Sequence, residues 1–95
     1  MLKIKLSKRA ADFLTTLQRS QPKHAKQIAR KIRELQERDG VVHDAKDLVG
    51  MSPYRRTDQG EYRIVFTIDG DTIVIELIGK RNDDEVYRQL KRVLK

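Results

Sequence analysis

The sequence contains no cysteine. Disulfides, thiolate zinc sites and a thiol nucleophile are therefore excluded, and the fold must be stabilised by packing alone. No apolar run approaches the roughly 20 residues that a membrane-spanning helix needs. Residues 1–5 alternate lysine with aliphatic side chains and lack the apolar core of a signal peptide. We therefore expect a soluble, cytoplasmic protein with no membrane partner.

Histidine and glycine are also scarce. His24 and His43 are the only histidines, they lie on different predicted elements, and neither has a second ligand at metal-binding spacing. We interpret both as ordinary surface or structural residues. The five glycines stand singly, so there is no glycine-rich loop to hold a phosphate. The acidic residues fall mostly in turns and at helix starts, where capping and solvation explain them. The sequence thus predicts neither a metal nor a cofactor.

Basic residues, in contrast, are abundant. Lysine and arginine total 21 against 14 aspartate and glutamate, which gives a net charge of +7 and a pI of about 9.9. Residues 1–40 hold eleven basic and four acidic side chains, whereas residues 41–95 hold ten of each. Such an excess is typical of nucleic-acid-binding domains. Many small basic proteins bind no nucleic acid, however, so charge alone leaves the partner open.

At 95 residues the chain is expected to form one domain, residues 1–95. Residues 2–6 alternate apolar and charged side chains, as in a strand with one buried face. Apolar residues at spacings of three and four predict helices over 8–18 and 22–38. Ser7 is a candidate N-cap of the first helix and Ser20 of the second. These two helices should form a helical hairpin.

The second half is expected to be mainly strands. Residues 41–53 form a predicted loop with one short turn, and 54–58 a weak strand. Alternation predicts a clear strand over 62–68, and the almost continuously apolar run 72–78 predicts a central strand covered on both faces. A last helix should follow a cap at Asp83 or Asp84, with Val86, Leu90, Val93 and Leu94 as its apolar positions. The predicted order is β-α-α-β-β-β-α, an α+β fold.

Basic and aromatic residues gather at the predicted end of the sheet. They are Tyr54, Arg55, Arg56, Arg63, Lys80, Arg81, Tyr87 and Arg88. Arg63 must project from the opposite side to Tyr62 and Ile64, and a hairpin partner strand would bring Arg55 or Arg56 near it. Several guanidinium groups on one sheet face repel one another unless an anion joins them, which favours a phosphate site. In the alternative interpretation, they pair with Asp58, Glu61 and the acidic residues 83–85 on a solvated surface.

This group suits one kind of chemistry. Attack of a ribose 2′-hydroxyl on a phosphodiester places extra negative charge on the phosphate oxygens, and fixed arginines can stabilise that charge without a metal. A tyrosine beside them could stack on a base. The residues are therefore compatible with RNA cleavage, with Arg55, Lys80 and Arg88 as further candidate phosphate or RNA contacts, and pairing with the nearby carboxylates stays open beside it.

Three segments together resemble the RelE/ParE toxin superfamily, and within it the RelE-type mRNA interferases. They are Gly60-Glu61-Tyr62-Arg63-Ile64-Val65-Phe66, Gly79-Lys80-Arg81 and Glu85-Val86-Tyr87. The resemblance covers essentially the whole chain. It implies a curved, mainly antiparallel sheet packed on a helical hairpin and a C-terminal helix. It further implies a toxin of a type II toxin–antitoxin system that cleaves mRNA in the ribosomal decoding site, and a cognate antitoxin that blocks it.

The resemblance also assigns roles to residues. Arg63 and Arg81 match the two arginines that stabilise the phosphate or protonate the leaving oxygen, and Tyr87 matches the tyrosine that orients the substrate. RelE-type toxins commonly place lysines on the strand before the turn, where this sequence has Arg55 and Arg56. A guanidinium hardly deprotonates, so we interpret Arg56 as an electrostatic stabiliser rather than a general base.

Two other functions stay open for the same fold. A ParE-like toxin would inhibit DNA gyrase by protein contact and would need no catalytic arginines. A non-catalytic relative would bind RNA without cleaving it. For the RNase hypothesis, the basic first half would dock on ribosomal RNA, with Lys23, Lys26, Arg30 and Lys31 on the second helix as candidate contacts.

Overall fold

The computed structural model describes residues 1–48, 50–81 and 85–93. The elements in chain order are β1 (Lys3–Leu6), α1 (Lys8–Ser20), α2 (Pro22–Glu37), β2 (Lys46–Asp47), β3 (Arg55–Gln59), β4 (Tyr62–Asp69), β5 (Thr72–Lys80) and α3 (Glu85–Val93). The predicted α+β class is confirmed. The prediction of a loop with only a short turn over 41–53 is wrong in one respect, because that segment contains β2. A segment of two residues is too short to show the alternation of a strand, so no sequence pattern indicated it.

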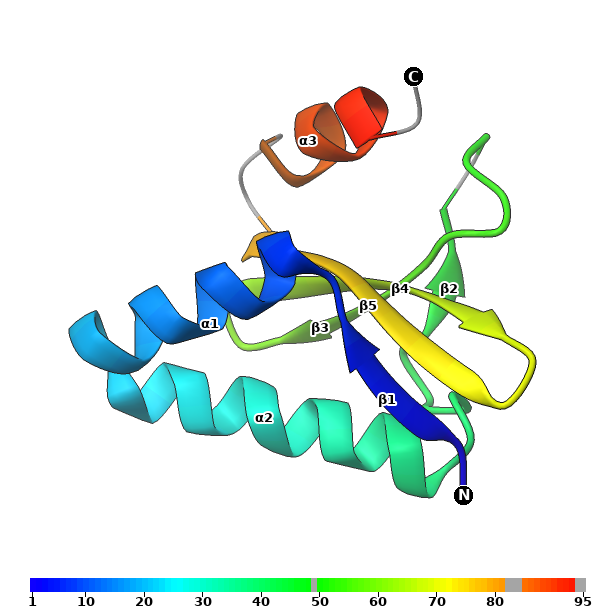
Figure 1. Cartoon of the computed structure of the whole chain (residues 1–95), viewed down its shortest axis with the longest axis horizontal. Coiled ribbons are helices and arrows are strands. Elements are labelled where there is room, and N and C mark those ends of the chain that lie inside the picture. The colour runs from blue at the N-terminus through cyan, green and yellow to red at the C-terminus, as the bar shows by residue number, and fades with distance from the viewer. Residues whose placement is uncertain (49, 82–84, 94–95) are drawn as a thin grey trace.

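The strands form one five-stranded sheet in the order β1-β5-β4-β3-β2. Only β1 and β5 are parallel, and all other neighbouring pairs are antiparallel, which confirms the mainly antiparallel sheet. The register between β4 and β5 shifts at Val65 and Phe66. Such a bulge increases the local bend and twist of the strand. Figure 1 shows β5 crossing the middle of the sheet between β1 and β4.

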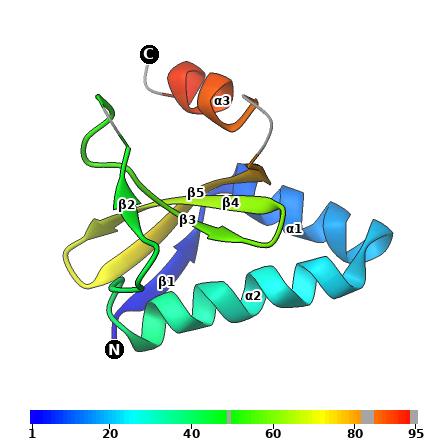
Figure 2. The same cartoon turned by 180° about the vertical axis from the view of Figure 1, so that it is seen from behind.

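Helices α1 and α2 form the predicted hairpin along one side of the sheet (Figure 2). Ser7 is the N-cap of α1, since its hydroxyl oxygen accepts the backbone N–H of Ala10. The expectation that Ser20 caps α2 is wrong, because Ser20 is the last residue of α1 and its hydroxyl donates to the carbonyl of Thr16. Gln21 precedes α2 instead, with Pro22 at its first position.

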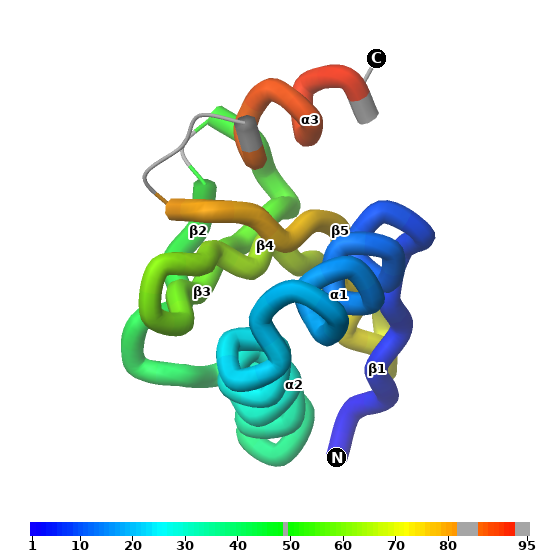
Figure 3. The backbone as a smooth tube through the Cα atoms, turned by 90° about the vertical axis from the view of Figure 1, so that its left-hand side faces the viewer, coloured from blue at the N-terminus to red at the C-terminus, as the bar shows by residue number. Residues whose placement is uncertain are grey.

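The sheet lies between the helical hairpin and α3 (Figure 3). Toward the hairpin, Tyr62, Ile64 and Phe66 of β4 pack with Ile28 and Leu35 of α2. Toward α3, a smaller cluster contains Leu48, Val65, Leu77, Val86 and Leu90. Strand β5 contributes to both clusters, which confirms that it is covered on both faces.

Helix α3 packs closely on β5. Val86 and Leu90 are buried, and a Cβ placed on Gly79 would lie well inside van der Waals contact with Cγ2 of Val86. The glycine therefore allows the close approach of the helix to the strand. The predicted caps Asp83 and Asp84, the apolar residue Leu94 and the side chain of Val93 lie outside the described residues. No helix in the described part of the chain is both long and apolar enough to cross a membrane.

Candidate functional site

Strand alternation places three charged residues on the sheet face that α3 covers. In the register of β3 and β4, Asp58 lies opposite Arg63, and Arg56 lies opposite Val65, which belongs to the α3-side cluster. Arg56 and Asp58 are two residues apart and therefore point to the same face. The prediction that a hairpin partner strand brings Arg55 or Arg56 near Arg63 is confirmed for Arg56.

The guanidinium of Arg63 has partners on both sides. Its Nε lies 2.8 Å from Oδ1 of Asp58, and its Nη2 lies 3.3 Å from Oδ2. Its Nη1 donates a hydrogen bond to the hydroxyl oxygen of Tyr87 on α3, and its Cζ lies 5.7 Å from the centre of the tyrosine ring. The hydrogen bond to Asp58 raises the pKa of Arg63. Arg63 is therefore a fixed cation that links β3, β4 and α3.

Asp58 joins the two arginines. Nη1 of Arg56 lies 3.4 Å from Oδ2 of Asp58, the oxygen that also faces Nη2 of Arg63. The repulsion between guanidinium groups that favoured a phosphate is thus relieved by a carboxylate of the chain itself. For Arg56 and Arg63, the alternative of pairing with Asp58 is confirmed. All three side chains are partly buried, with 24, 20 and 15% exposure for Arg56, Asp58 and Arg63.

A second carboxylate fixes the backbone of this site. Asp44 accepts hydrogen bonds from the Thr57 hydroxyl at 2.7 Å, the Asp58 N–H at 3.0 Å and the Lys31 ammonium at 3.1 Å. Burial alone would raise the pKa of Asp44, but these hydrogen bonds and the charge of Lys31 lower it from 3.8 to about 2. Asp44 therefore stays ionised at neutral pH and holds β3 against α2.

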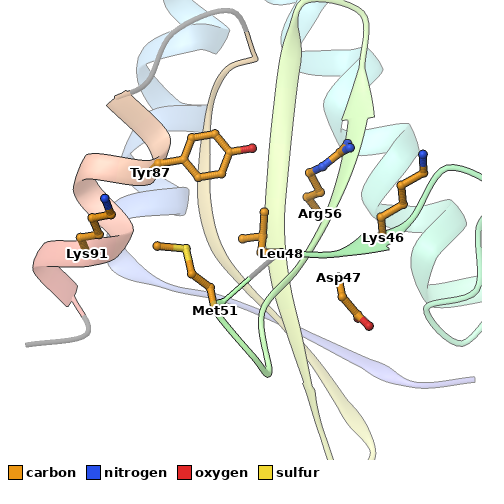
Figure 4. A pocket seen from close by; sticks show the side chains of 7 residues that line it. All are labelled: Lys46, Asp47, Leu48, Met51, Arg56, Tyr87 and Lys91. Carbon is orange, nitrogen blue, oxygen red and sulfur yellow. The ribbon is translucent and has the colours of Figure 1, made fainter.

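A pocket of about 440 Å³ opens beside the arginines (Figure 4). The side chains around it are Lys46, Asp47, Leu48, Met51, Arg56, Tyr87 and Lys91. Tyr87 and Lys91 come from α3, whereas Arg56 and Lys46 come from paired strands, where they occupy the same register position. The carboxylate of Asp47 points away from Tyr87 and Arg56 (Figure 4). The pocket thus combines an apolar and aromatic wall with three cations.

Two predicted members of the site lie elsewhere. Arg55 is opposite Phe66 in the register, its Cζ lies 5.9 Å from the centre of that ring, and Phe66 packs toward the helical hairpin. Its Nε is 3.1 Å from Oδ1 of Asp47, an ion pair without hydrogen-bond geometry. Lys80 is opposite Tyr62, which also belongs to the hairpin side. The expectation that Arg55 and Lys80 converge with Arg63 is wrong. Their strand positions put their side chains on the hairpin side of the sheet, whereas Arg63 lies on the side that α3 covers.

Arg81 and Arg88 are exposed. The backbone N–H of Arg81 donates to the carbonyl of Glu61 at 2.9 Å, so the ladder between β4 and β5 continues one step past Lys80. Alternation from Gly79 places the Arg81 side chain on the α3 face. Arg81 is thus available at the rim of the face that carries Arg63.

The candidate docking residues on α2 divide into two kinds. Lys23, Lys26 and Arg30 are exposed, whereas Lys31 is buried and paired with Asp44. The prediction that Lys31 faces the ribosome is therefore wrong, because the residue lies on the core side of the helix. Arg33, absent from the predicted set, joins Lys26 and Arg30 around a shallow pocket of about 270 Å³.

Sequence reasoning missed Lys46, Lys91 and the role of Asp58. Lys91 could have been found, since it stands four residues after Tyr87 and therefore on the same helix face. Lys46 gave no signal because β2 has only two residues. Asp58 was considered only as a surface partner. Among the described residues, no group of three or more potential metal ligands lies close enough to hold an ion.

Comparisons with known proteins agree with this fold. Residues 4–85 match the sequence model of the ParE toxin of the type II toxin–antitoxin system parDE. No curated protein sequence matches the chain significantly. The isolated RelE toxin of E. coli is similar in structure, with 21% identity, full coverage of both chains and a TM-score of 0.71.

Two toxin–antitoxin complexes contain chains of the same fold. One is the YoeB–YefM complex of Staphylococcus aureus, with 22% identity, 85% of this chain and 98% of that chain covered, and a TM-score of 0.69. The other is the RelB–RelE complex of Methanococcus jannaschii, with 26% identity, 90 and 96% coverage and a TM-score of 0.68. The family match spans most of the sequence, so this chain belongs to the ParE toxin family of type II toxin–antitoxin systems, within the RelE/ParE superfamily.

Proposed function

We propose that the chain is a ribosome-dependent endoribonuclease that cleaves mRNA in the decoding site and so inhibits translation. The observation that supports this most is the contact of Arg63 with Tyr87 beside a cationic pocket. It joins a fixed positive charge to an aromatic ring, and these are the two groups that recognise a phosphate and a base. The reaction is attack of the ribose 2′-hydroxyl on the adjacent phosphodiester.

Each residue has a defined part in this proposal. Arg63 and Arg56 stabilise negative charge that develops on the phosphate oxygens, because they are already oriented before the substrate binds. Arg81, at the rim, contacts the same phosphate. Tyr87 stacks on a base next to the scissile bond, and its hydroxyl keeps Arg63 in position. Arg88 contacts the flanking backbone of the mRNA.

The partners follow from the charge distribution and the family. The exposed residues Lys23, Lys26 and Arg30 of α2 dock on ribosomal RNA through phosphate contacts. A cognate antitoxin, as in the YoeB–YefM and RelB–RelE complexes, covers the toxin and neutralises it. The protein acts in the cytoplasm, where ribosomes and antitoxin meet.

One observation favours a second function. The sequence model that matches the chain describes ParE toxins rather than RelE toxins. A ParE-like protein would inhibit DNA gyrase by binding it. We favour the RNase because Arg56 and Tyr87 line one pocket and Arg63 contacts Tyr87, an arrangement that inhibition by protein contact does not require.

Two assays separate these functions. Purified full-length protein is added to ribosomes that carry a defined mRNA, and toe-printing maps any cleavage in the decoding site. In parallel, the same protein is added to a gyrase supercoiling reaction. We expect mRNA cleavage without loss of supercoiling, and a 2′-deoxy substitution at the scissile nucleotide should abolish cleavage because it removes the nucleophile. Gyrase inhibition without cleavage would show that the proposal is wrong.

Toxicity in growing bacteria tests the residues. The double variant R63A/R81A should relieve growth arrest, since it removes two phosphate-stabilising charges. The matched control is R9A/R19A, which removes two exposed arginines of α1, on the other side of the sheet. Equal toxicity of R63A/R81A and wild type would contradict the proposed mechanism.

A further inference from the structure

The proposed reaction needs a group that removes the 2′-hydroxyl proton. Arg56 and Arg63 are unsuited to this role because a guanidinium hardly deprotonates, and the pKa of Arg63 is raised further by Asp58. His24 packs edge-on against Tyr62, whose side chain faces the helical hairpin, so it lies on the wrong side of the sheet. His43 is exposed in the segment before β2. The ammonium groups of Lys46 and Lys91 in the pocket carry donors and no acceptor, so a carboxylate is the better-suited chemical type.

Two carboxylates of the described residues lie next to the pocket. Asp47 borders it, but its carboxylate is paired with Arg55 and points away from Tyr87 and Arg56 (Figure 4). Asp58 does not line the pocket directly, but it contacts Arg56, which does. It also contacts Arg63, which contacts Tyr87. Asp58 therefore contacts two of the three arginines proposed to bind the phosphate, Arg56 and Arg63.

The existing hydrogen bonds of Asp58 leave its carboxylate able to accept one more hydrogen bond. A carboxylate has about four lone-pair sites. Oδ2 faces Nη1 of Arg56 and Nη2 of Arg63, whereas Oδ1 accepts only Nε of Arg63 among the described residues. About one fifth of the side chain is exposed, at 20%. Oδ1 thus has fewer hydrogen-bond partners than Oδ2 and can accept a substrate hydroxyl.

Asp44 holds the backbone of Asp58 in place. The backbone N–H of Asp58 donates to Oδ2 of Asp44, which in turn is held by Thr57 and Lys31. A fixed carboxylate beside fixed arginines would place a proton acceptor and charge stabilisers around one phosphodiester without further rearrangement.

We propose that Asp58 is the general base of the RNase reaction, an inference that rests on the proposed function. Oδ1 of Asp58 takes the 2′-hydroxyl proton while the 2′-oxygen forms a bond to phosphorus. The bond between phosphorus and the 5′-oxygen breaks, and that oxygen takes a proton from a water molecule. The resulting hydroxide is neutralised by the proton that Asp58 releases. The products are a 2′,3′-cyclic phosphate and a 5′-hydroxyl end.

Charged groups surround Asp58 on several elements. The groups that face it or its partners are Arg56 on β3, Arg63 on β4, Lys46 on β2, Tyr87 and Lys91 on α3, and Asp44 in the loop before β2. The test of Asp58 as a base must therefore separate proton transfer from neutralisation of these cations.

The experiment measures single-turnover cleavage of ribosome-bound mRNA by excess full-length protein at pH 7. D58N should lower the rate by about 100-fold or more. D58E, which restores a carboxylate, should recover part of the rate. Binding of each variant to ribosomes, measured by co-sedimentation, should stay within about twofold of wild type. D71N is the control, because Asp71 is an exposed partner of Lys3 at the β4–β5 turn.

The possible outcomes separate the base from other roles. If Asp58 only neutralises the arginines, D58N will bind RNA more tightly and cleave at least as fast as wild type, and the inference fails. If D47N rather than D58N loses cleavage, Asp47 is the base and the inference also fails. If D58N unfolds, D58E with normal thermal stability provides the test through its rate, and a D58E rate as low as background overturns the inference. If wild type itself does not cleave, the proposed function fails instead.

Discussion

The ammonium of Lys31 lies 3.1 Å from Oδ1 of Asp44, and this pair joins α2 to the segment that precedes β2. The Lys31 side chain is only 7% exposed and that of Asp44 is 30% exposed. Because Asp44 also binds Thr57 and the backbone of Asp58, the pair connects the basic helix to the strand that carries the candidate site. It explains why a lysine predicted to dock on RNA is instead part of the interior.

We expect the stability contribution of Asp44 to depend on pH. Its pKa is lowered from 3.8 to about 2 in the folded protein, so the ionised form stabilises the fold. This contribution, about 2 kcal/mol, should be fully present above about pH 4 and should disappear as the pH falls through 2. The measurement is urea unfolding of wild type and D44N between pH 7 and pH 2. The difference in unfolding free energy should shrink toward pH 2, and a constant difference would contradict the assignment.

Lys31 and its exposed neighbours should respond differently to substitution. K31M removes the ammonium that pairs with Asp44 inside the protein and should lower the unfolding free energy by about 1–3 kcal/mol. K26A/R30A removes exposed charges and should leave stability within about 0.5 kcal/mol of wild type. It should instead weaken ribosome binding and reduce the dependence of that binding on salt. Thermal melts and co-sedimentation at two salt concentrations check both results, and the reverse pattern would show that α2 is not the docking surface.

Arg55 and Arg56 form a matched pair on opposite faces of the sheet. R56A removes a cation beside Asp58 and the pocket, so single-turnover cleavage should fall by about 100-fold. R55A removes a cation that lies over Phe66 on the hairpin side, so cleavage should change by less than about threefold. Both variants lose the same charge, and the comparison therefore controls for long-range electrostatics. Equal losses in the two variants would mean that the general positive field, rather than local contact, drives the effect.

The packing of Gly79 against Val86 can be tested by compensation. G79A places a methyl group against Cγ2 of Val86, which should cost about 1–3 kcal/mol and shift α3 together with Tyr87. V86A leaves a small cavity in the same place. The double variant G79A/V86A should be more stable than the sum of the two single effects predicts, because the new methyl group fills the vacated space. Denaturant unfolding of the four proteins gives this coupling, and strict additivity would argue against direct contact.

The spacing of apolar residues along the sequence determined most of the fold. Apolar spacings of three and four located α1 and α2, and alternation located β4 and the buried β5, because burial of one face or two leaves a regular pattern. The expectation that Arg55 or Arg56 lies near Arg63 also followed from alternation, and the grouping of Arg63 with Tyr87 followed from the resemblance. What the sequence left undecided were positions that local pattern does not encode. The two-residue strand β2 has no period, and the register between β3 and β4 alone decided that Arg56 and not Arg55 faces Arg63.

Only the tertiary structure decided which charges meet. Lys31 and Asp44 are 13 residues apart, and Arg63 and Tyr87 are 24 apart, and no sequence period connects either pair. The structure thereby turned Asp58 from an expected surface partner into the centre of the candidate site. The reason is physical: secondary structure depends on neighbours within a few residues, whereas an ion pair depends on which elements the hydrophobic clusters bring together.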